Sequence, residues 1–510
     1  MKIKKSFFVL FAAIAVYGLM ILHHGYELGR SDNEQAAYGF YLNDNSLFPA
    51  DFYIQSLVHQ TPNERTFYGQ FISFAGEKIP EFSFVFHIVF TIILLLGIRK
   101  ISAEFIENEW VRWLAILVLF LCLYNIHLGG NELYYNSFIP SLPAKAIGVW
   151  GLWFFLQKRY LFASLLFSCS VFFQPLAGIQ IIVISLSVFL IISFRQKRSL
   201  LFKNFLWLAM PAAFLTLPFL IPALTRFNDA NVPDKFIFDV FFSFRNPHHF
   251  LPSYFPLKNY FILVPVFGFA LIFFKKHSTE IMYFILVILL GCILYSFFVE
   301  ILHSILVASS QWFKSTIWAE MFGVIAVFGF IEQLANKILD KYFSKSRKII
   351  ATFLMVFLFV FLTLFPFRFP WKVKYDFEPF LSSDCAIEIS RLAKENTPIN
   401  ACFVTPIDFT ELKFHGQRSS YIDYKLPVHS KSGIIEWMNR ITRVYNIDYR
   451  NTEKGFEVSK KASENYYRLT SQNFIALKKF GVTHILTHIS QKLPFCEVAK
   501  NNEFVIYKIP

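Results

Sequence analysis

Two carboxylates that follow the first apolar run have the chemistry of a catalytic or metal-binding site. Asp32 and Glu34 lie in Arg30-Ser-Asp-Asn-Glu-Gln35, a polar stretch directly beyond a run that can cross a membrane. A carboxylate there can accept the proton of an incoming hydroxyl group or hold a divalent cation, Mg²⁺ or Mn²⁺, beside a phosphate. The alternative is that both are solvated loop charges. Asp32 and Glu34 are therefore the candidate catalytic residues, and Asp32 is also a candidate metal ligand.

Two further aspartates of the same polar segment have structural explanations. Asn43-Asp-Asn-Ser46 is typical of a turn, because short polar side chains bond to the nearby backbone there. Asp51 comes shortly after Pro49 at the expected start of a helix, where an aspartate caps free backbone N–H groups. We expect Asp44 to form a turn and Asp51 to cap a helix.

Basic and amide side chains in later polar segments complete the candidate site. Arg245-Asn-Pro-His-His249 precedes an apolar run, and its arginine can bind a phosphate. Histidine can ligate a metal, but adjacent histidines point in different directions on regular structure, so we expect one to face a ligand. Gln311 and Lys314 flank the entrance to a later run, where interfacial anchoring is the alternative for Lys314. The candidate substrate-binding residues are Arg245, His248, His249, Gln311 and Lys314.

Two other polar features lie close to the predicted membrane. Glu320 falls inside an apolar run, and because a charge is costly in lipid we expect it to face a cavity or a partner. Residues 131–136 combine asparagine, glutamate and tyrosine in a short connection. Sugar-binding sites favour such residues, and so do interfaces.

The composition indicates a membrane protein. The 510 residues include 66 phenylalanines, 55% of the chain is hydrophobic, and the mean hydropathy is +0.46. One soluble core cannot hide so many apolar side chains, and many lie in nearly uncharged runs of about 17 or more residues, long enough to span the hydrocarbon layer. We expect an α-helical polytopic membrane protein with about eleven spans. The predicted spans are 6–23, 82–98, 111–127, 144–157, 160–174, 177–194, 203–223, 259–274, 281–301, 312–333 and 349–367.

The charge pattern predicts how these spans are oriented. The net charge is +14, but the basic residues collect at alternate ends of the spans, as topology signals do, which argues against a nucleic-acid partner. The positive-inside rule puts the N-terminus in the cytoplasm and the chain in a bacterial inner membrane. Residues 1–370 then form the transmembrane domain, with a large first external loop at 24–81. The turn at Gln174-Pro175 and residues 371–510 lie on the periplasmic face.

The last 140 or so residues change character, because charged residues there separate short apolar runs. Strand and helix patterns alternate, which favours an extracytoplasmic α/β domain at 371–510. The predicted strands are Ala401–Thr405, Thr483–Thr487 and Phe504–Tyr507, and the predicted helices are Cys385–Glu395 and Asn473–Phe480.

Several function classes have no support in the sequence. It has no Walker loop, GxGxxG, HExxH or GxSxG motif in a suitable context, so nucleotide-driven transport and serine hydrolysis lack their residues. The six cysteines include no CxxC pair.

With this layout, the chain resembles the GT-C superfamily of membrane glycosyltransferases. The resemblance rests on a cytoplasmic N-terminus, acidic residues just after the first span, about eleven spans and an external C-terminal α/β domain. The stretch from Ile387 to Pro398 also looks like the start of the external domain in oligosaccharyltransferase-like members. Their WWDYG-type acceptor motif is absent, and Pro406-Ile-Asp-Phe409 stands in its place. The chain is similar, too, to uncharacterised bacterial multi-pass proteins with the Asn-Pro-His-His arrangement.

The resemblance implies transfer of a sugar from a polyprenyl-phosphate donor to an acceptor glycan, lipid or protein at the external membrane face. It implies that Asp32, with Glu34, acts as base or metal ligand, and that Arg245, His248 or Lys314 meets the donor phosphates. A lipid or anion transporter, or flippase, is the rival; it predicts facing charges within the membrane and internal repeats. A non-catalytic subunit of an envelope complex is the third interpretation.

Overall fold

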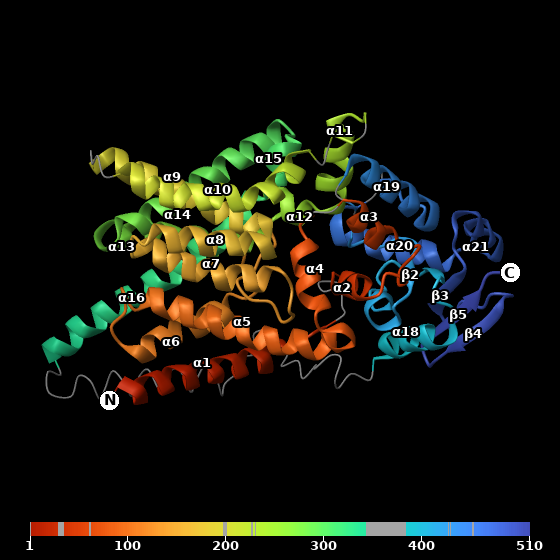
Figure 1. Ribbon diagram of the computed structural model, residues 1–510, viewed down its shortest axis with the longest axis horizontal. Coiled ribbons are helices and arrows are strands. Elements are labelled where there is room, and N and C mark those ends of the chain that lie inside the picture. Colours follow the sequence, from red (N-terminus) through yellow and green to blue (C-terminus); the bar gives the residue numbers. More distant parts are fainter. Residues whose placement is uncertain are drawn as a thin grey trace.

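The computed structural model describes residues 2–28, 35–60, 63–196, 201–225, 228–229, 231–342, 384–426, 428, 430–450 and 453–510. Most of these residues are helical, and Figure 1 shows a bundle of long helices with a smaller domain at one end. The helices of the bundle are α1 (Lys2–His24), α5 (Ile79–Ser102), α6 (Glu109–Leu117) with the π-helix η2 (Val118–Cys122), α7 (Ser141–Leu156), α8 (Tyr160–Phe173), α9 (Pro175–Gln196), α10 (Leu201–Thr225), α13 (Leu257–His277), α14 (Thr279–Ser296) with the π-helix η5 (Phe297–Ile301), and α16 (Thr316–Tyr342).

Seven of the described helical segments are long and apolar enough to cross a membrane, as expected of a multi-pass membrane protein. The predicted number of eleven is not confirmed. The predictions at 111–127, 144–157 and 160–174 fall on shorter helices, and the prediction at 349–367 lies outside the described residues. With 16 and 14 residues, α7 and α8 extend only about 24 and 21 Å, less than the hydrocarbon thickness of about 30 Å.

The turn between α8 and α9 is as tight as predicted. Gln174 is extended between the two helices, with φ of −142°, so this is a break and not a kink. Gly178 lies against the end of α8, where an added Cβ would come 2.4 Å from the backbone nitrogen of Val171. Any larger residue at this position would push the two helices apart.

The connections predicted to be external meet at one end of the bundle, next to the C-terminal domain (Figure 1). The backbone N–H of Glu27 donates to the carbonyl of Asn136 at 2.9 Å, and the Asn131 amide donates to the carbonyl of Lys314 at 3.0 Å. At the opposite end, Arg99 forms a two-pronged ion pair with Glu109, with oxygen distances of 2.5 and 2.6 Å. The orientation of the spans remains a prediction.

The first polar segment, residues 24–81, is helical over much of the part that the structure describes. It forms α2 (Ala36–Asn43), α3 (Phe52–His59), α4 (Thr66–Ser73) and the 3₁₀ helix η1 (Gly76–Lys78), which lie between the bundle and the C-terminal domain (Figure 1). Both structural predictions for its aspartates are confirmed. The Asp44 carboxylate accepts the backbone N–H of Ser46 at 2.9 Å, and Asp51 caps α3 through the N–H of Ile54 at 2.9 Å.

The C-terminal domain is built on a mixed five-stranded sheet with the order β2-β1-β3-β5-β4. Strands β2, β1 and β3 are parallel, and β5 and β4 are antiparallel to their neighbours. The strands are β1 (Cys402–Val404), β2 (Ser419–Ser420), β3 (His484–His488), β4 (Cys496–Lys500) and β5 (Phe504–Lys508), and the helices are α18 (Cys385–Asn396), the π-helix η7 (Leu412–Gly416), α19 (Lys431–Tyr445), the 3₁₀ helix η8 (Gly455–Glu457), α20 (Val458–Tyr467), α21 (Ser471–Leu477) and the 3₁₀ helix η9 (Lys478–Phe480). The three predicted strands and two predicted helices are present.

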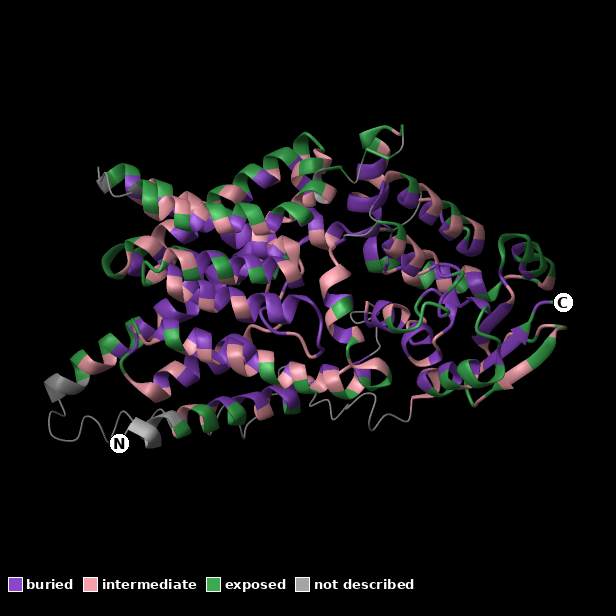
Figure 2. Ribbon diagram, viewed as in Figure 1, coloured by how far each residue is buried: buried purple, intermediate pink, exposed green. Residues whose placement is uncertain are grey.

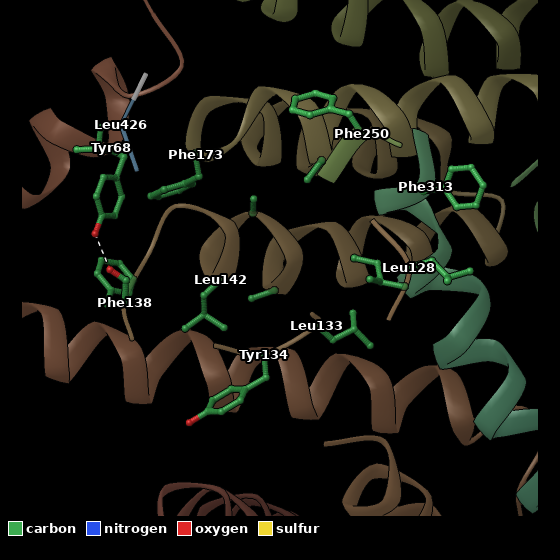
Figure 3. Close-up of a cluster of buried hydrophobic side chains, with 14 of the residues drawn as sticks. Tyr68, Leu128, Leu133, Tyr134, Phe138, Leu142, Phe173, Phe250, Phe313 and Leu426 are labelled. Carbon is green, nitrogen blue, oxygen red and sulfur yellow. Dashed lines mark hydrogen bonds between the residues drawn. The ribbon is translucent and has the colours of Figure 1, made fainter. Parts of the chain in front are cut away.

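The core is continuous from the bundle into this domain. Figure 2 shows buried residues filling the centre of both parts, while exposed positions follow the outer faces of the helices. Figure 3 shows the cluster where the connections meet, with Tyr68 of α4 donating its hydroxyl to the carbonyl of Phe138 at 2.5 Å. Leu426 of the C-terminal domain belongs to the same cluster.

A buried ion cluster ties the first polar segment to the C-terminal domain. The Lys413 ammonium lies 3.0 Å from Oδ1 of Asp51 and also bonds to the carboxylate of Asp423. Asp51 is fully buried, and its Oδ2 accepts the backbone N–H of Ser420 at 2.9 Å. Burial raises the pKa of Asp423, against the pull of the Lys413 charge. One cation thus neutralises two carboxylates from segments far apart in the chain.

Replacing Lys413 by methionine should strongly destabilise this junction. Lys413→Met leaves two carboxylates in a buried site without their cation, which costs about 3–5 kcal/mol for a broken buried pair. Thermal unfolding in detergent measures the loss of stability. Lys500→Met is the control, because Lys500 pairs with Glu497 at 3.4 Å where both side chains are more than half exposed, and such pairs contribute about 0–1 kcal/mol. Equal shifts in the two variants would contradict the role of the cluster.

Candidate functional site

A cavity of about 500 Å³ opens where the first polar segment, the bundle and the C-terminal domain meet. We call it the interfacial cavity. Its lining residues come from six separate segments of the chain: Gln60, Asn63, Glu64 and Arg65; Gln174, Pro175, Leu176 and Ile179; Phe219, Ile221, Pro222 and Thr225; Asp229; Ser309, Gln311 and Lys314; and Ser430. Two of the predicted substrate-binding residues, Gln311 and Lys314, are among them.

Arg65 reaches the cavity because Asn63 organises the start of α4. The Asn63 side chain accepts the backbone N–H of Arg65 at 2.8 Å, and its own backbone N–H donates to the Thr66 hydroxyl at 2.9 Å. The Arg65 guanidinium is hydrogen-bonded to the Tyr53 hydroxyl, whose pKa burial raises to about 12. The Nε atom of Arg65 is buried and has no hydrogen-bond partner.

Lys314 is held by a strained turn between α15 (Ile305–Ser309) and the 3₁₀ helix η6 (Trp312–Ser315). Gln311 adopts the left-handed conformation, with φ and ψ both 44°, which costs energy for any residue other than glycine. The amide of Gln180, on α9, compensates by donating to the carbonyls of Ser310 at 2.7 Å and of Gln311 at 3.0 Å. Strain maintained in this way is typical of binding sites.

The cavity combines unsatisfied polar atoms with an apolar wall. Besides Arg65 Nε, the side-chain oxygens of Gln174 and Gln311 are buried without a partner. Buried polar atoms are normally hydrogen-bonded, so these three atoms are available to bond to a molecule in the cavity. The lining also includes Ile221 of α10, whose side chain is 58% exposed. α10 carries three internal prolines, Pro211, Pro218 and Pro222.

Arg245 lies at the junction with the C-terminal domain and not in the interfacial cavity. It ends the π-helix η3 (Phe238–Arg245), which follows α11 (Asp234–Ile237), and is only 2% exposed. Its guanidinium stacks on the Tyr424 ring at 4.3 Å and donates to the carbonyl of the same residue and to the Asn246 side chain. These contacts use its donors for packing between the two parts of the chain.

The two histidines of α12 (Pro247–Phe250) lie side by side, and His248 contacts the C-terminal domain. Their rings are 4.2 Å apart; His248 also packs on Phe456 at 4.5 Å, and His249 Nδ1 lies 3.4 Å from the carbonyl of Gly129. Burial lowers the pKa of His248 to about 3, helped by the charges of nearby arginine and lysine residues, and burial likewise lowers that of His249. Both rings are neutral at pH 7, so neither adds positive charge for a phosphate.

A second polar cluster lies inside the bundle. His127 Nε2 is 2.9 Å from the Glu132 carboxylate, and the Lys145 ammonium bonds to the Glu132 carbonyl and lies 4.5 Å from the centre of the Tyr135 ring. Glu320 faces the same place, across a cavity of about 10 Å³ that is large enough for about one water molecule. Although burial alone would raise the pKa of Glu132, its bond with His127 holds it below the usual value.

The predicted catalytic residues Asp32 and Glu34 lie outside the described residues. Glu64 is the carboxylate from the same polar segment that lines the interfacial cavity. Sequence reasoning missed Glu64, Arg65 and the brace Gln180; the polar run Asn63-Glu-Arg-Thr66 was the available signal for the first two. Within the described ranges, no group of three or more histidine, cysteine, aspartate or glutamate side chains is arranged to hold a metal ion.

One comparison with known proteins gives a match. Residues 386–444 match the model of a family described as a domain of unknown function, DUF6798. The match covers part of the C-terminal domain, from α18 into α19. No curated protein matches the chain. The functional argument therefore rests on the geometry of the interfacial cavity.

The His248 site should make the protein acid-sensitive. The folded protein binds fewer protons at this ring than the unfolded chain does between the unfolded pKa of 6.5 and the folded value of about 3. Stability is therefore lost as pH falls through that window. Between pH 7 and 5, His248→Gln should reduce the loss in the free energy of unfolding by about 2 kcal/mol. Denaturant unfolding at each pH measures this free energy. An unchanged pH slope in the variant would contradict this account.

Proposed function

We propose that this chain is a membrane glycosyltransferase of the GT-C type, which moves a sugar from a polyprenyl-phosphate donor to an acceptor at the membrane surface. The observation that carries the proposal is the interfacial cavity. It brings the cations of Arg65 and Lys314 close enough for their charges to act on each other. The same cavity has an apolar wall on α10 that continues onto an exposed apolar face.

This combination suits a lipid-linked phosphate. Two like charges that face each other are unfavourable alone and favourable once an anion lies between them. The unpartnered oxygens of Gln174 and Gln311 can accept hydroxyl groups of a sugar. The prenyl chain would lie along Ile221 and its apolar neighbours, in contact with the bilayer.

The proposed reaction is a displacement at the anomeric carbon. A carboxylate takes the proton of the acceptor hydroxyl, the acceptor oxygen bonds to the anomeric carbon, and the bond from that carbon to the phosphate oxygen breaks. Polyprenyl phosphate leaves, and Arg65 and Lys314 stabilise its developing charge. Asp32 is the proposed base and Glu34 is the second candidate from the same stretch of sequence. Glu64, which lines the cavity, is the alternative.

A lipid or anion transporter is the second candidate. The specific observation in its favour is the buried cluster of Glu132, Lys145 and Glu320, because transport pathways often contain facing charges of this kind. A transporter needs an anion site but no general base, so the two candidates differ in the expected effect of removing carboxylates.

The cationic pair should determine donor binding. Arg65→Gln and Lys314→Gln each remove one charge-assisted contact, so affinity for polyprenyl phosphate should fall about tenfold or more. Native mass spectrometry of the detergent-purified protein measures the bound lipid. Lys258→Gln is the matched control, because this exposed lysine starts α13 at the same end of the bundle and does not line the cavity. Undiminished binding in both cavity variants would contradict the site.

Removing the base should abolish transfer without loss of donor binding. Asp32→Asn or Glu64→Gln, whichever residue is the base, should lower kcat by about 10²–10⁴-fold, measured as transfer of radiolabelled sugar in proteoliposomes. Asp44→Asn is the control, because its carboxylate serves a turn of the same segment. Full transfer in both test variants would contradict both residues as the base, whereas no transfer by the wild type, with lipid binding intact, would favour the transporter.

A further inference from the structure

A second large cavity lies on another side of the first polar segment, and the proposed reaction does not use it. It has a volume of about 810 Å³ and lies between the first polar segment, the start of α5 and the C-terminal domain. We call it the charged groove. The Phe40 and Phe414 rings, 5.3 Å apart, are buried in its lining.

The charged groove is lined by side chains of both charges. Arg391 and Lys394, here called the basic pair, are three residues apart on α18 and so lie on one face of that helix. Glu77 of η1 and Glu81 of α5, the acidic pair, are four residues apart on the other side. Among the described residues, no ion pair joins the two pairs across the groove, and each of these four side chains is exposed.

The lining also has an unsatisfied polar atom. His415 Nε2 is buried without a hydrogen-bond partner, while the ring bonds to the backbone of Leu28. Burial lowers the pKa of His415 to about 4, helped by the charge of Arg391, so the ring is neutral at pH 7. Two more carboxylates, Asp44 and Glu395, line the groove. Acids therefore outnumber fixed cations, which disfavours a simple anion. Because the basic pair can still bind an anionic group, the lining suits a ligand that carries both charges.

The position of the acidic pair points to the membrane surface. The candidate membrane span that combines η1 and α5 covers Gly76–Ser102. Its 27 residues extend about 40 Å, whereas the hydrocarbon layer is about 30 Å thick. Because Glu77, Lys78 and Glu81 lie at its beginning, we expect this end of the helix to lie in the headgroup layer. Phe74, just before it, is 85% exposed, as expected of a side chain that contacts lipid.

We propose that the charged groove binds a phosphoethanolamine group. The phosphate lies against the basic pair, and the ammonium donates hydrogen bonds to the acidic pair. The same group can belong to a phospholipid of the facing leaflet or to a soluble molecule, and the location at the headgroup layer favours the lipid. This inference is independent of the proposed transferase activity.

Native mass spectrometry of the purified protein, exposed to vesicles of phosphatidylethanolamine, phosphatidylcholine or phosphatidylglycerol, tests the proposal. The wild type should retain phosphatidylethanolamine in preference to the other two, because a trimethylammonium cannot donate a hydrogen bond and glycerol has no cation. Arg391→Gln with Lys394→Gln should weaken retention about tenfold or more. Glu77→Gln with Glu81→Gln should remove the preference over phosphatidylglycerol.

The controls separate the sources of the ligand. Lys461→Gln with Arg468→Gln changes exposed basic residues of α20 and its end, outside the groove, and should leave retention unchanged. Soluble phosphoethanolamine and inorganic phosphate form a further arm, read by thermal shift. Binding of phosphatidylethanolamine or of soluble phosphoethanolamine that the basic-pair variant loses supports the proposal. Which of the two binds shows whether the ligand is a lipid or a soluble molecule. Retention that the basic-pair variant keeps, or equal binding of inorganic phosphate, overturns it.

Discussion

Amide side chains that donate to the carbonyls of other segments hold the end of the bundle together. Gln180 bonds to the turn before Lys314, Asn131 bonds to Lys314 itself, and Asn259 donates to the carbonyl of His127 at 2.7 Å. Irregular backbone near a bilayer cannot rely on water for its hydrogen bonds, so buried partners must supply them. Each connection therefore needs its neighbours in order to be stable.

The interfacial cavity lies where several of these braced segments meet. Arg65 comes from a segment anchored to the C-terminal domain through Asp51 and Lys413, whereas Lys314 comes from a turn anchored to α9. A rigid frame of this type can hold two like charges near each other before a ligand arrives. Such preorganisation lowers the cost of stabilising charge during a reaction.

Local patterns predicted local structure well. The turn at Asp44, the cap at Asp51 and the three strands follow from residue types that act within a few positions of themselves. β4 and β2 were not predictable in the same way, because β4 is largely exposed and β2 has only two residues. Contacts between distant parts of the chain were not predictable either. Arg245 bonds to Tyr424, which is 179 positions away, and no spacing rule connects the two residues. The roles predicted for Asp32, Glu34 and Arg245 remain predictions.

The prolines of α10 have a mechanical consequence for the interfacial cavity. A proline lacks an N–H group, so Pro211, Pro218 and Pro222 leave three carbonyls one turn earlier without their helical donor. α10 is thus the cavity wall that bends with the least loss of hydrogen bonding. A long flexible molecule could enter sideways by flexing this single helix, while the braced side that carries the cations stays in place.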